Sequence, residues 1–383
     1  MSNDNIKICM VDSAIGNDYT FYLCSGIKSV GMDISLVVPE DREVGFKIDF
    51  PLIKLSPTKS SSVSKSDKLG KYINYLIELY KYIKKSKFDV VHFQFLRRIE
   101  TESLFFLFLR LARIKLVYTV HDVSPLNKSK LNSILNIVAY KSANILIVHS
   151  AKNKQMLLDR VSLNPEKIKV VPHGNFNHYL PEKLITKNDA RKYFELNSDE
   201  KVLLFFGFIK EYKGLDILLE AVAIASKTID NLTLIIAGAA QSEKLVEGYN
   251  KKISELPKNV KVIYHSEFIP REKVAMYFQA SDVLVLPYRI ISHSGVLHLA
   301  YSFGRPIIGT RVGDFEEFIE SGKSGILTNS TDSLGVAEAI VRFYSDPDNV
   351  NRMCSYARNL NDTKFSWTNI ALSMKEIYHK LKS

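Results

Sequence analysis

The chain has 383 residues, of which 46% are hydrophobic and 24% charged, the balance of a soluble globular protein. This length exceeds one ordinary hydrophobic core, so we expect two domains. No apolar run approaches the length of a spanning helix, and three scattered cysteines argue against a disulfide framework or a cysteine metal site. A reducing, cytoplasmic compartment fits this cysteine usage best.

The positive charge is concentrated in the first half of the chain. Of the formal net charge of +11, residues 1–180 supply 26 Lys+Arg against 16 Asp+Glu, a balance of +10. Such asymmetry indicates an anionic partner, which could be a membrane surface, a charged acceptor or a nucleic acid. We expect no nucleic acid, because the basic residues match no known nucleic-acid-binding module.

Strands and helices alternate along the whole chain. Apolar runs predict the strands, and the clearest helix of the first half covers residues 69–85. The pattern loosens at 174–187 and then restarts. Such alternation predicts parallel sheets with helices on both faces. The predicted strands cover residues 6–14, 33–40, 88–95, 114–122, 143–150, 168–174, 201–208, 232–240, 260–268, 281–288 and 305–310.

This order of elements predicts an α/β fold of two doubly wound, Rossmann-like domains. We place the first domain at residues 1–175 and the second at 188–365. Residues 366–383 form a last helix with one apolar face, which we expect to pack back on the first domain. Ligands of doubly wound sheets bind beyond the carboxyl ends of the strands, so the residues that follow strands are candidates for a site.

Two lysines follow a strand of the second domain. Lys210 and Lys213 come after the strand at 202–208, and Gly214 then opens a helix. A lysine beside a helix N-terminus can meet a phosphate with both its charge and the helix dipole. The alternative is a solvated turn with two surface lysines.

A second helix of the same domain opens in a similar way. Ser294 and Gly295 follow the strand at 282–288. Ser294 could cap the helix, and Gly295 leaves room for a phosphate to approach backbone N–H groups. An ordinary Ser-Gly cap is the alternative. Two such helix N-termini in one domain favour a diphosphate ligand.

The first domain offers weaker candidates. Gly16 follows the first strand, but no G-x-G-x-x-G fingerprint is present, so a nicotinamide cofactor is not supported. His121 and Asp122 end another strand, and a histidine there lines a site or only packs. His173 ends the last strand of the domain, where a linker turn is an equal alternative. We read residues 346–348, Asp-Pro-Asp, as an acidic turn and propose no metal.

The helix within residues 69–87 carries two apolar stripes. We expect the first to face the sheet, and it consists of Ile73, Leu76, Ile77, Tyr80 and Ile83. The second stripe carries tyrosines flanked by lysines. Basic residues beside interfacial tyrosines suit a lipid headgroup layer, so we predict that the first domain attaches reversibly to an anionic membrane through this helix. A solvated basic face with tyrosines packed on neighbouring loops is the alternative. The second stripe is Tyr72, Tyr75, Leu79 and Tyr82, flanked by Lys68, Lys71, Lys81, Lys84, Lys85 and Lys87.

Nine segments together resemble the retaining GT-B glycosyltransferases of glycosyltransferase family 4. They occur in the family's order and at sensible spacings, over nearly the whole chain. One such motif alone is a weak signal, whereas the ordered set is strong. The segments are DVVHFQF, TVHD, VPHG, GFIKEYKG, LIIAGAA, SDVLVLPY, FGRPIIGT, VGDFEEFIESGKSGIL and FSWTNIA.

The resemblance implies two domains that face one another across a cleft, with a nucleotide-sugar donor in the second and most of the acceptor in the first. It implies that Lys213 contacts the donor diphosphate and that His121 lies near the donor sugar. We assign His121 and Asp122 as candidate catalytic residues. Such enzymes need no metal, because positive side chains and helix N-termini stabilise the leaving diphosphate. The other candidates are Gly16, Lys210, Ser294, Gly295 and Val296 for the diphosphate, and Gly207, Phe208, His173 and His293 for the cleft.

The sequence departs from the family pattern in two places. The usual Gly-Arg-Leu is Gly207-Phe208-Ile209 here, and Lys210 can supply the missing charge. Two glutamates usually precede FGRP, the first contacting the sugar and the second the ribose hydroxyls. An alignment on the glycine and proline of that segment places Ser292 and Leu299 at their positions.

We therefore expect a retaining, metal-independent hexosyltransferase without a cofactor. It would move a hexose from a UDP- or GDP-linked donor to a polysaccharide, oligosaccharide or lipid-linked acceptor. We expect it in the cytoplasm, with peripheral attachment to the inner face of the membrane. The missing glutamates keep open a non-catalytic, glycosyltransferase-like subunit. A sugar-nucleotide epimerase, which can share the GT-B architecture, is a weaker alternative.

Overall fold

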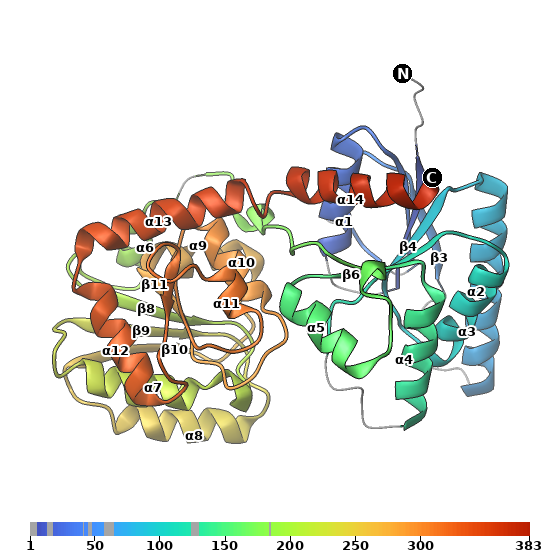
Figure 1. The fold of residues 1–383 in the computed structure, drawn as a ribbon. Coiled ribbons are helices and arrows are strands. Elements are labelled where there is room, and N and C mark those ends of the chain that lie inside the picture. Colours follow the sequence, from blue (N-terminus) through green and yellow to red (C-terminus); the bar gives the residue numbers. More distant parts are fainter. Residues whose placement is uncertain are drawn as a thin grey trace. The chain divides into compact units, whose positions relative to one another are not determined.

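The structure of the chain is a computed structural model, which describes residues 6–13, 18–40, 42–44, 48–56, 65–123, 130–183 and 185–383. The chain divides into two compact units (Figure 1). The first unit comprises residues 1–174 and 366–383, and the second comprises residues 175–365. Each unit is built on one twisted parallel sheet, so the α/β class and the pair of Rossmann-like sheets predicted from the sequence are confirmed.

The first unit has a parallel sheet in the order 3-2-1-4-5-6-7, which is the doubly wound arrangement. Its strands, from edge to edge, are β3 (Leu52–Ser56), β2 (Asp33–Pro39), β1 (Lys7–Asp12), β4 (Val90–Phe95), β5 (Leu116–Thr119), β6 (Ile145–Val148) and β7 (Ile168–Val170). The described helices are α1 (Tyr19–Ser29), α2 (Lys65–Ser86), α3 (Ile99–Leu111), α4 (Lys130–Ser142), α5 (Ala151–Arg160), the 3-10 turn η1 (Pro165–Lys167) and α14 (Trp367–Lys382).

Successive side chains of β1 point to opposite faces of this sheet and so enter two different cores. Cys9 and Val11 pack in the core that α2, α3, α4 and α5 cover. Ile8 and Met10 pack in the core that α1 and α14 cover. Both faces of the sheet are therefore buried, as the near-continuous apolar strands require.

The structure confirms the predicted buried face of α2 only in part. Tyr72, Tyr75 and Leu79 are buried in the core under the sheet, at 3% exposure or less. Ile73 and Ile77, predicted to face the sheet, are 45% and 46% exposed. Leu76 and Ile83 of the same predicted stripe are buried as expected, so the buried face of α2 takes residues from both stripes. A membrane-facing stripe of tyrosines is therefore excluded.

Helix α14 returns to the first unit and packs along α1. The two backbones approach closely at Gly26, where an added Cβ would lie 2.7 Å from the carbonyl oxygen of Trp367. The Trp367 ring lies 5.2 Å from the ring of Tyr19, centroid to centroid. Near the far end of the helix, the Tyr378 hydroxyl lies 2.6 Å from Nδ1 of His92 in β4. The last helix is thus part of the core of this unit.

The second unit repeats the same topology, with strand order 10-9-8-11-12-13. Its strands are β10 (Val260–His265), β9 (Leu232–Ala237), β8 (Lys201–Phe206), β11 (Val283–Leu286), β12 (Ile307–Gly309) and β13 (Gly325–Leu327). Its helical elements are η2 (Asn177–Tyr179), α6 (Lys187–Tyr193), η3 (Glu211–Lys213), α7 (Leu215–Ala225), α8 (Glu243–Ser254), α9 (Arg271–Ala280), α10 (Gly295–Ser302), α11 (Phe315–Phe318), α12 (Ser333–Tyr344) and α13 (Pro347–Asp362).

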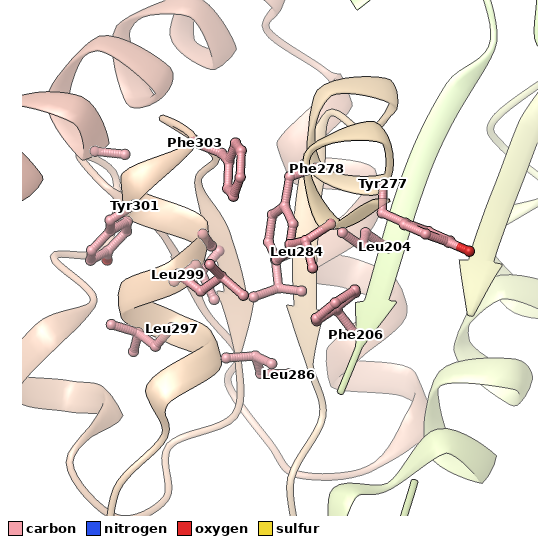
Figure 2. Packing of buried hydrophobic residues seen from close by; sticks show 14 of the residues in the cluster. Leu204, Phe206, Tyr277, Phe278, Leu284, Leu286, Leu297, Leu299, Tyr301 and Phe303 are labelled. Atoms are coloured by element: carbon pink, nitrogen blue, oxygen red, sulfur yellow. The ribbon is translucent and has the colours of Figure 1, made fainter. Parts of the chain in front are cut away.

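Helices α9 and α10 pack on one face of the second sheet through an aromatic and leucine core (Figure 2). Phe278 of α9 stacks on Phe303, just after α10, with ring centroids 5.0 Å apart and planes 13° from parallel. Leu299 of α10 lies in this core and is 6% exposed. The position that the family resemblance assigns to a ribose-binding glutamate is therefore filled here by a core side chain.

The tight approach of α14 to α1 gives a test of the fold. We expect Gly26→Ala to destabilise the first unit by about 1–3 kcal/mol, because the new methyl group forces α14 away from α1. Gly248→Ala in α8 is the matched control: nothing lies within 4 Å of its added Cβ, and a helical glycine replaced by alanine should gain up to about 1 kcal/mol.

The single tryptophan lies at this contact, so its fluorescence reports the docking of α14 during urea unfolding. Equal stability of Gly26→Ala and the unmodified protein would show that the contact between the two helices is looser than the structure has it.

Candidate functional site

The candidate residues of the second unit gather at the switch point of its sheet. Strands β8 and β11 are neighbours, and the connections from their carboxyl ends lead to opposite sides. In a doubly wound sheet this is where a ligand finds a crevice. Gly207, Phe208, Lys210 and Lys213 follow β8, while His293, Ser294, Gly295 and Val296 follow β11.

Glycines allow the loops at this point to touch backbone to backbone. Gly214 has φ of 68°, and a Cβ on it would overlap the carbonyl oxygen of Pro287. Gly238 has φ of 148°, and a Cβ there would overlap the carbonyl oxygen of Gly207. A side chain at either position would push apart the loops that follow β8, β9 and β11.

Lys213 is held inside this junction of loops. Its side chain is only 8% exposed, and its Nζ lies 5.4 Å from the centre of the Tyr288 ring. A Cβ added to Gly207 would lie 3.5 Å from the same Nζ and 3.2 Å from Cγ2 of Val296. Gly207, Lys213 and Val296 therefore converge on one point. The alternative of two surface lysines on a solvated turn does not hold for Lys213.

The two lysines make this point electropositive. Burial, and then the charge of Lys210, lowers the pKa of Lys213 from 10.5 to about 8. Lys210 lies over the rings of Phe208 and Tyr212, at 5.3 and 5.8 Å from their centres. Within the described chain, no carboxylate lies within ion-pair distance of either ammonium group. Arg289 nearby is different, because its guanidinium is paired with Asp216 at 2.6 Å.

The N-terminus of α10 faces the same group of loops. Ser294 occupies the N-cap position and is buried, but its hydroxyl makes no capping hydrogen bond, so the predicted side-chain cap is wrong. Its backbone is extended at φ −130° and ψ 108°. A Cβ on Gly295 would lie 3.3 Å from the Phe176 ring, so this glycine leaves a narrow space above the helix end. The first N–H groups of a helix have no partner within the helix.

His293 is held by a carboxylate that the sequence did not single out. Nδ1 of His293 donates to Oδ2 of Asp314 at 2.7 Å, and their side chains are 11% and 1% exposed. The second oxygen of Asp314, Oδ1, is buried without a hydrogen-bond partner among the described residues. Asp314 follows β12, so the strand next to β11 orients the histidine.

In the first unit, three consecutive strands each deliver a histidine beyond their carboxyl ends. His121 follows β5, His149 follows β6 and His173 follows β7. His149 Nδ1 donates to the carbonyl of Val171 at 3.0 Å, and its Nε2 lies 3.0 Å from Nδ1 of His121. The ring of Tyr19 lies against all three.

His121 is fixed from several sides and remains half-buried. Its Nε2 lies 3.0 Å from Oε1 of Gln94, and the Phe95 ring stacks on it at 4.1 Å. Asp122, next in the chain, is exposed. Gly16 lies outside the described residues. The assignments of His121 and Asp122 to catalysis and of Gly16 to the diphosphate remain predictions.

Sequence reasoning missed the residues that orient the candidates, namely Asp314 beside His293 and the pair of Gln94 and His149 beside His121. One signal for His149 was available. The segments TVH, IVH and VPH repeat a histidine at or just past a strand end, and in parallel strands such residues lie at one edge. No sequence pattern identifies Asp314 as the partner of His293, because the two residues are 21 positions apart in the chain.

The described residues hold no group of three His, Cys, Asp or Glu side chains that could bind a metal ion. Over the same residues, no helix combines the length and the apolar character that crossing a membrane requires. The Asp346 side chain accepts a hydrogen bond from the backbone N–H of Asn349 and so caps α13.

Comparison with known proteins supports the same family from both units. A family model described as Glycosyltransferase Family 4 matches residues 16–174, and one described as Glycosyl transferases group 1 matches residues 200–346. D-inositol 3-phosphate glycosyltransferase of Corynebacterium urealyticum is 26% identical over 246 residues, 63% of this chain and 57% of its own length. The chain thus matches less than two-thirds of that relative.

Solved structures share the fold over almost the whole chain. Anabaena HepE in complex with UDP aligns with a TM-score of 0.74 at 18% identity, over 98% of this chain and 100% of its own. Sucrose-phosphate synthase of Thermosynechococcus elongatus aligns with a TM-score of 0.73, also at 18% identity, over 98% of this chain and 99% of its own. Family models match both units, and both sheets have the doubly wound strand order. The chain therefore belongs to the GT-B glycosyltransferases of glycosyltransferase family 4.

Proposed function

We propose that this protein is a retaining hexosyltransferase that takes its sugar from a nucleoside diphosphate. The observation that carries the proposal is the pair of Lys210 and Lys213, which meets no carboxylate among the described residues and lies where β8 and β11 diverge. A buried ammonium group without a counter-charge is unfavourable, and an arriving diphosphate would supply that charge. The UDP complex of Anabaena HepE supports a nucleotide ligand for this fold.

The proposed reaction needs cations and N–H donors more than a protein nucleophile. The bond from the anomeric carbon to the diphosphate oxygen breaks, and a bond to the acceptor oxygen forms on the same face of the sugar. The acceptor proton passes to the departing diphosphate. Lys213, Lys210 and the first N–H groups of α10 would stabilise the charge on that leaving group. We propose that no metal or other cofactor takes part and that the base is uracil or guanine.

Two alternative functions are considered, and the first of them rests on the position of Leu299. Leu299 packs in the core of the second unit, so no carboxylate grips the ribose from this position. That favours, as a second candidate, a non-catalytic subunit that binds nucleotide without turning it over. An epimerase would instead convert a UDP-sugar with no acceptor present, which separates it from both.

We also propose that the protein acts in the cytoplasm, at the inner face of a membrane, on a glycan or lipid-linked acceptor. The balance of +10 over residues 1–180 supports an anionic surface as the partner of the first unit.

The function is tested with a panel of UDP- and GDP-hexoses and lipid-linked or free glycan acceptors. We expect one donor to be consumed only when an acceptor is present, with the donor's anomeric configuration kept in the product by NMR. Inversion would refute the mechanism. Tight binding without turnover would favour the non-catalytic subunit, and no binding of any nucleotide would refute the function.

Lys213→Ala should weaken binding of the preferred donor by about 1.5–3 kcal/mol, because a charge-assisted hydrogen bond to the diphosphate is lost. Isothermal titration measures this. Lys227→Ala, an exposed lysine of the same unit, is the matched control and should bind normally.

Donor binding should also depend on pH through Lys213. Only the protonated ammonium attracts the diphosphate, so affinity should be level below pH 8 and fall as pH rises beyond the pKa of about 8. Arginine stays charged across this range, so Lys213→Arg should show little change between pH 7 and pH 10 if it binds. The same pH profile in both proteins would assign the titration to another group.

Burial of this charge should cost stability in the absence of ligand. The pKa of Lys213 is 10.5 when unfolded and about 8 when folded, so the unfolded chain binds the proton more tightly. Lys213→Met should therefore raise the free energy of unfolding, by up to about 3 kcal/mol below pH 8, with the gain fading as pH approaches 10.5. Calorimetry at pH 7 and 10 measures it, with Lys227→Met at an exposed position of the same unit as control. Destabilisation by methionine at pH 7 would contradict this account.

A further inference from the structure

Helices α2 and α3 expose large apolar side chains on one side of the first unit. These are Leu69, Ile73 and Ile77 on α2 and Leu104, Leu107, Phe108 and Leu111 on α3, each 40–74% exposed. We call them the α2–α3 face. Single exposed leucines are ordinary, but seven on two neighbouring helices form a patch of the kind that marks an interaction site.

The face is hollowed along its middle. A groove of about 390 Å³ runs between the two helices, with an almost purely apolar lining. Ile73 and Ile77 of α2 form one wall, and Leu104 and Phe108 of α3 form the other. Tyr80 closes the α2 side, with its ring 4.9 Å from that of Phe108. An apolar chain would fit this groove without burying an unpaired polar group.

One end of the face is strongly basic. Helices α2 and α3 both end at the amino edge of the sheet, next to the paired strands β4 and β5. Among the acidic groups there, Glu78 pairs with Lys81 at 2.9 Å and Asp89 pairs with Lys382 at 3.3 Å. We call the exposed cations at this end the basic rim, and they are Lys81, Lys84, Lys85, Arg110, Arg113 and Lys115.

The rim continues the apolar stripe of α2. Lys84 follows Ile73, Ile77 and Tyr80 at helical spacing, so this exposed lysine lies on the same side of α2, one turn beyond the groove residue Tyr80. Lysine is depleted in interfaces between proteins, whereas cations beside an apolar helix face are typical of surfaces that lie on anionic lipid. The charge complementarity therefore selects a bilayer over another protein as the occupant.

We propose that the α2–α3 face docks on an anionic bilayer, with the basic rim among the headgroups and an acyl chain in the groove. This names the surface for the membrane location given under the proposed function and rests on it. The surface differs from the tyrosine stripe expected from the sequence, because Tyr72 and Tyr75 of that stripe are buried. Docking itself requires no nucleotide, so it can be tested independently of sugar transfer.

The first test is sedimentation with vesicles of phosphatidylcholine alone or mixed equally with phosphatidylglycerol, at low and high salt. We expect binding only to the anionic vesicles at low salt. The triple variant Lys84→Gln, Lys85→Gln, Lys115→Gln should bind roughly a hundredfold more weakly. Lys227→Gln, Lys251→Gln, Lys273→Gln removes the same charge from exposed positions of the second unit and should bind normally.

The apolar part is tested with Leu104→Ser, Phe108→Ser, which should weaken vesicle binding about tenfold or more. Leu334→Ser, Leu372→Ser removes leucines that are 56% and 46% exposed elsewhere and is the control. Insertion is tested by tryptophan fluorescence in the presence of lipids brominated on the acyl chain. These lipids should quench the fluorescence of Phe108→Trp more than that of the unmodified protein, whereas Leu372→Trp should show no extra quenching.

The proposal would be overturned if the protein bound neither type of vesicle or both equally well. It would also be overturned if the control variants lost as much vesicle binding as the variants of the α2–α3 face and the basic rim. A concentration-dependent dimer that Leu104→Ser, Phe108→Ser abolishes, without vesicle binding, would assign the face to a second copy of the chain instead. Donor binding, measured on the same variants, separates the two proposals. If vesicles bind but no nucleotide does, the proposed function fails and the docking surface stands.

Discussion

The burial of the Lys213 ammonium group is the constraint on which the site of the second unit depends. The surrounding loops keep this side chain 8% exposed and lower its pKa to about 8, with Lys210 as a second positive charge close by. A protein selected for stability alone would place an apolar side chain there. Gly214 and Gly238 let the surrounding loops approach backbone to backbone, where any side chain would collide. Stability is given up at the point where the sheet topology favours ligand binding.

The same loops explain how the chain departs from the family pattern without losing its positive charge. Phe208 stands where the family usually has arginine, and it is 45% exposed. Its ring and that of Tyr212 lie near the Lys210 ammonium, at 5.3 and 5.8 Å. A cation near aromatic faces is stabilised without a carboxylate, so its charge stays available to an anion. An arginine is thus exchanged for an aromatic platform and a lysine two residues later.

The parallel α/β architecture could be predicted from the sequence because buried parallel strands appear as continuous apolar runs, and the helices between them have a different periodicity. The predicted strands omit β3 and β13, which are the edge strands at which the two sheets end. β3 contains Lys54 and is only partly buried, and β13 has three residues, so neither shows a long apolar run. The buried face of α2 was predicted only in part, because both of its stripes are apolar at helical spacing and the buried residues come from each of them.

The partners of the candidate histidines could not be predicted for a related reason. Asp314 meets His293 only because β12 lies beside β11, and His149 meets His121 only because β6 lies beside β5. Strand order is a property of the whole sheet, so local patterns do not show the pair of His293 and Asp314, and the repeated histidines after strands are the one sequence signal for His149. Leu299 has left the site for the core, whereas Asp314 brings a buried carboxylate to the loop after β12. The carboxylate that contacts His293 therefore comes from the loop after β12, a position outside the family motif.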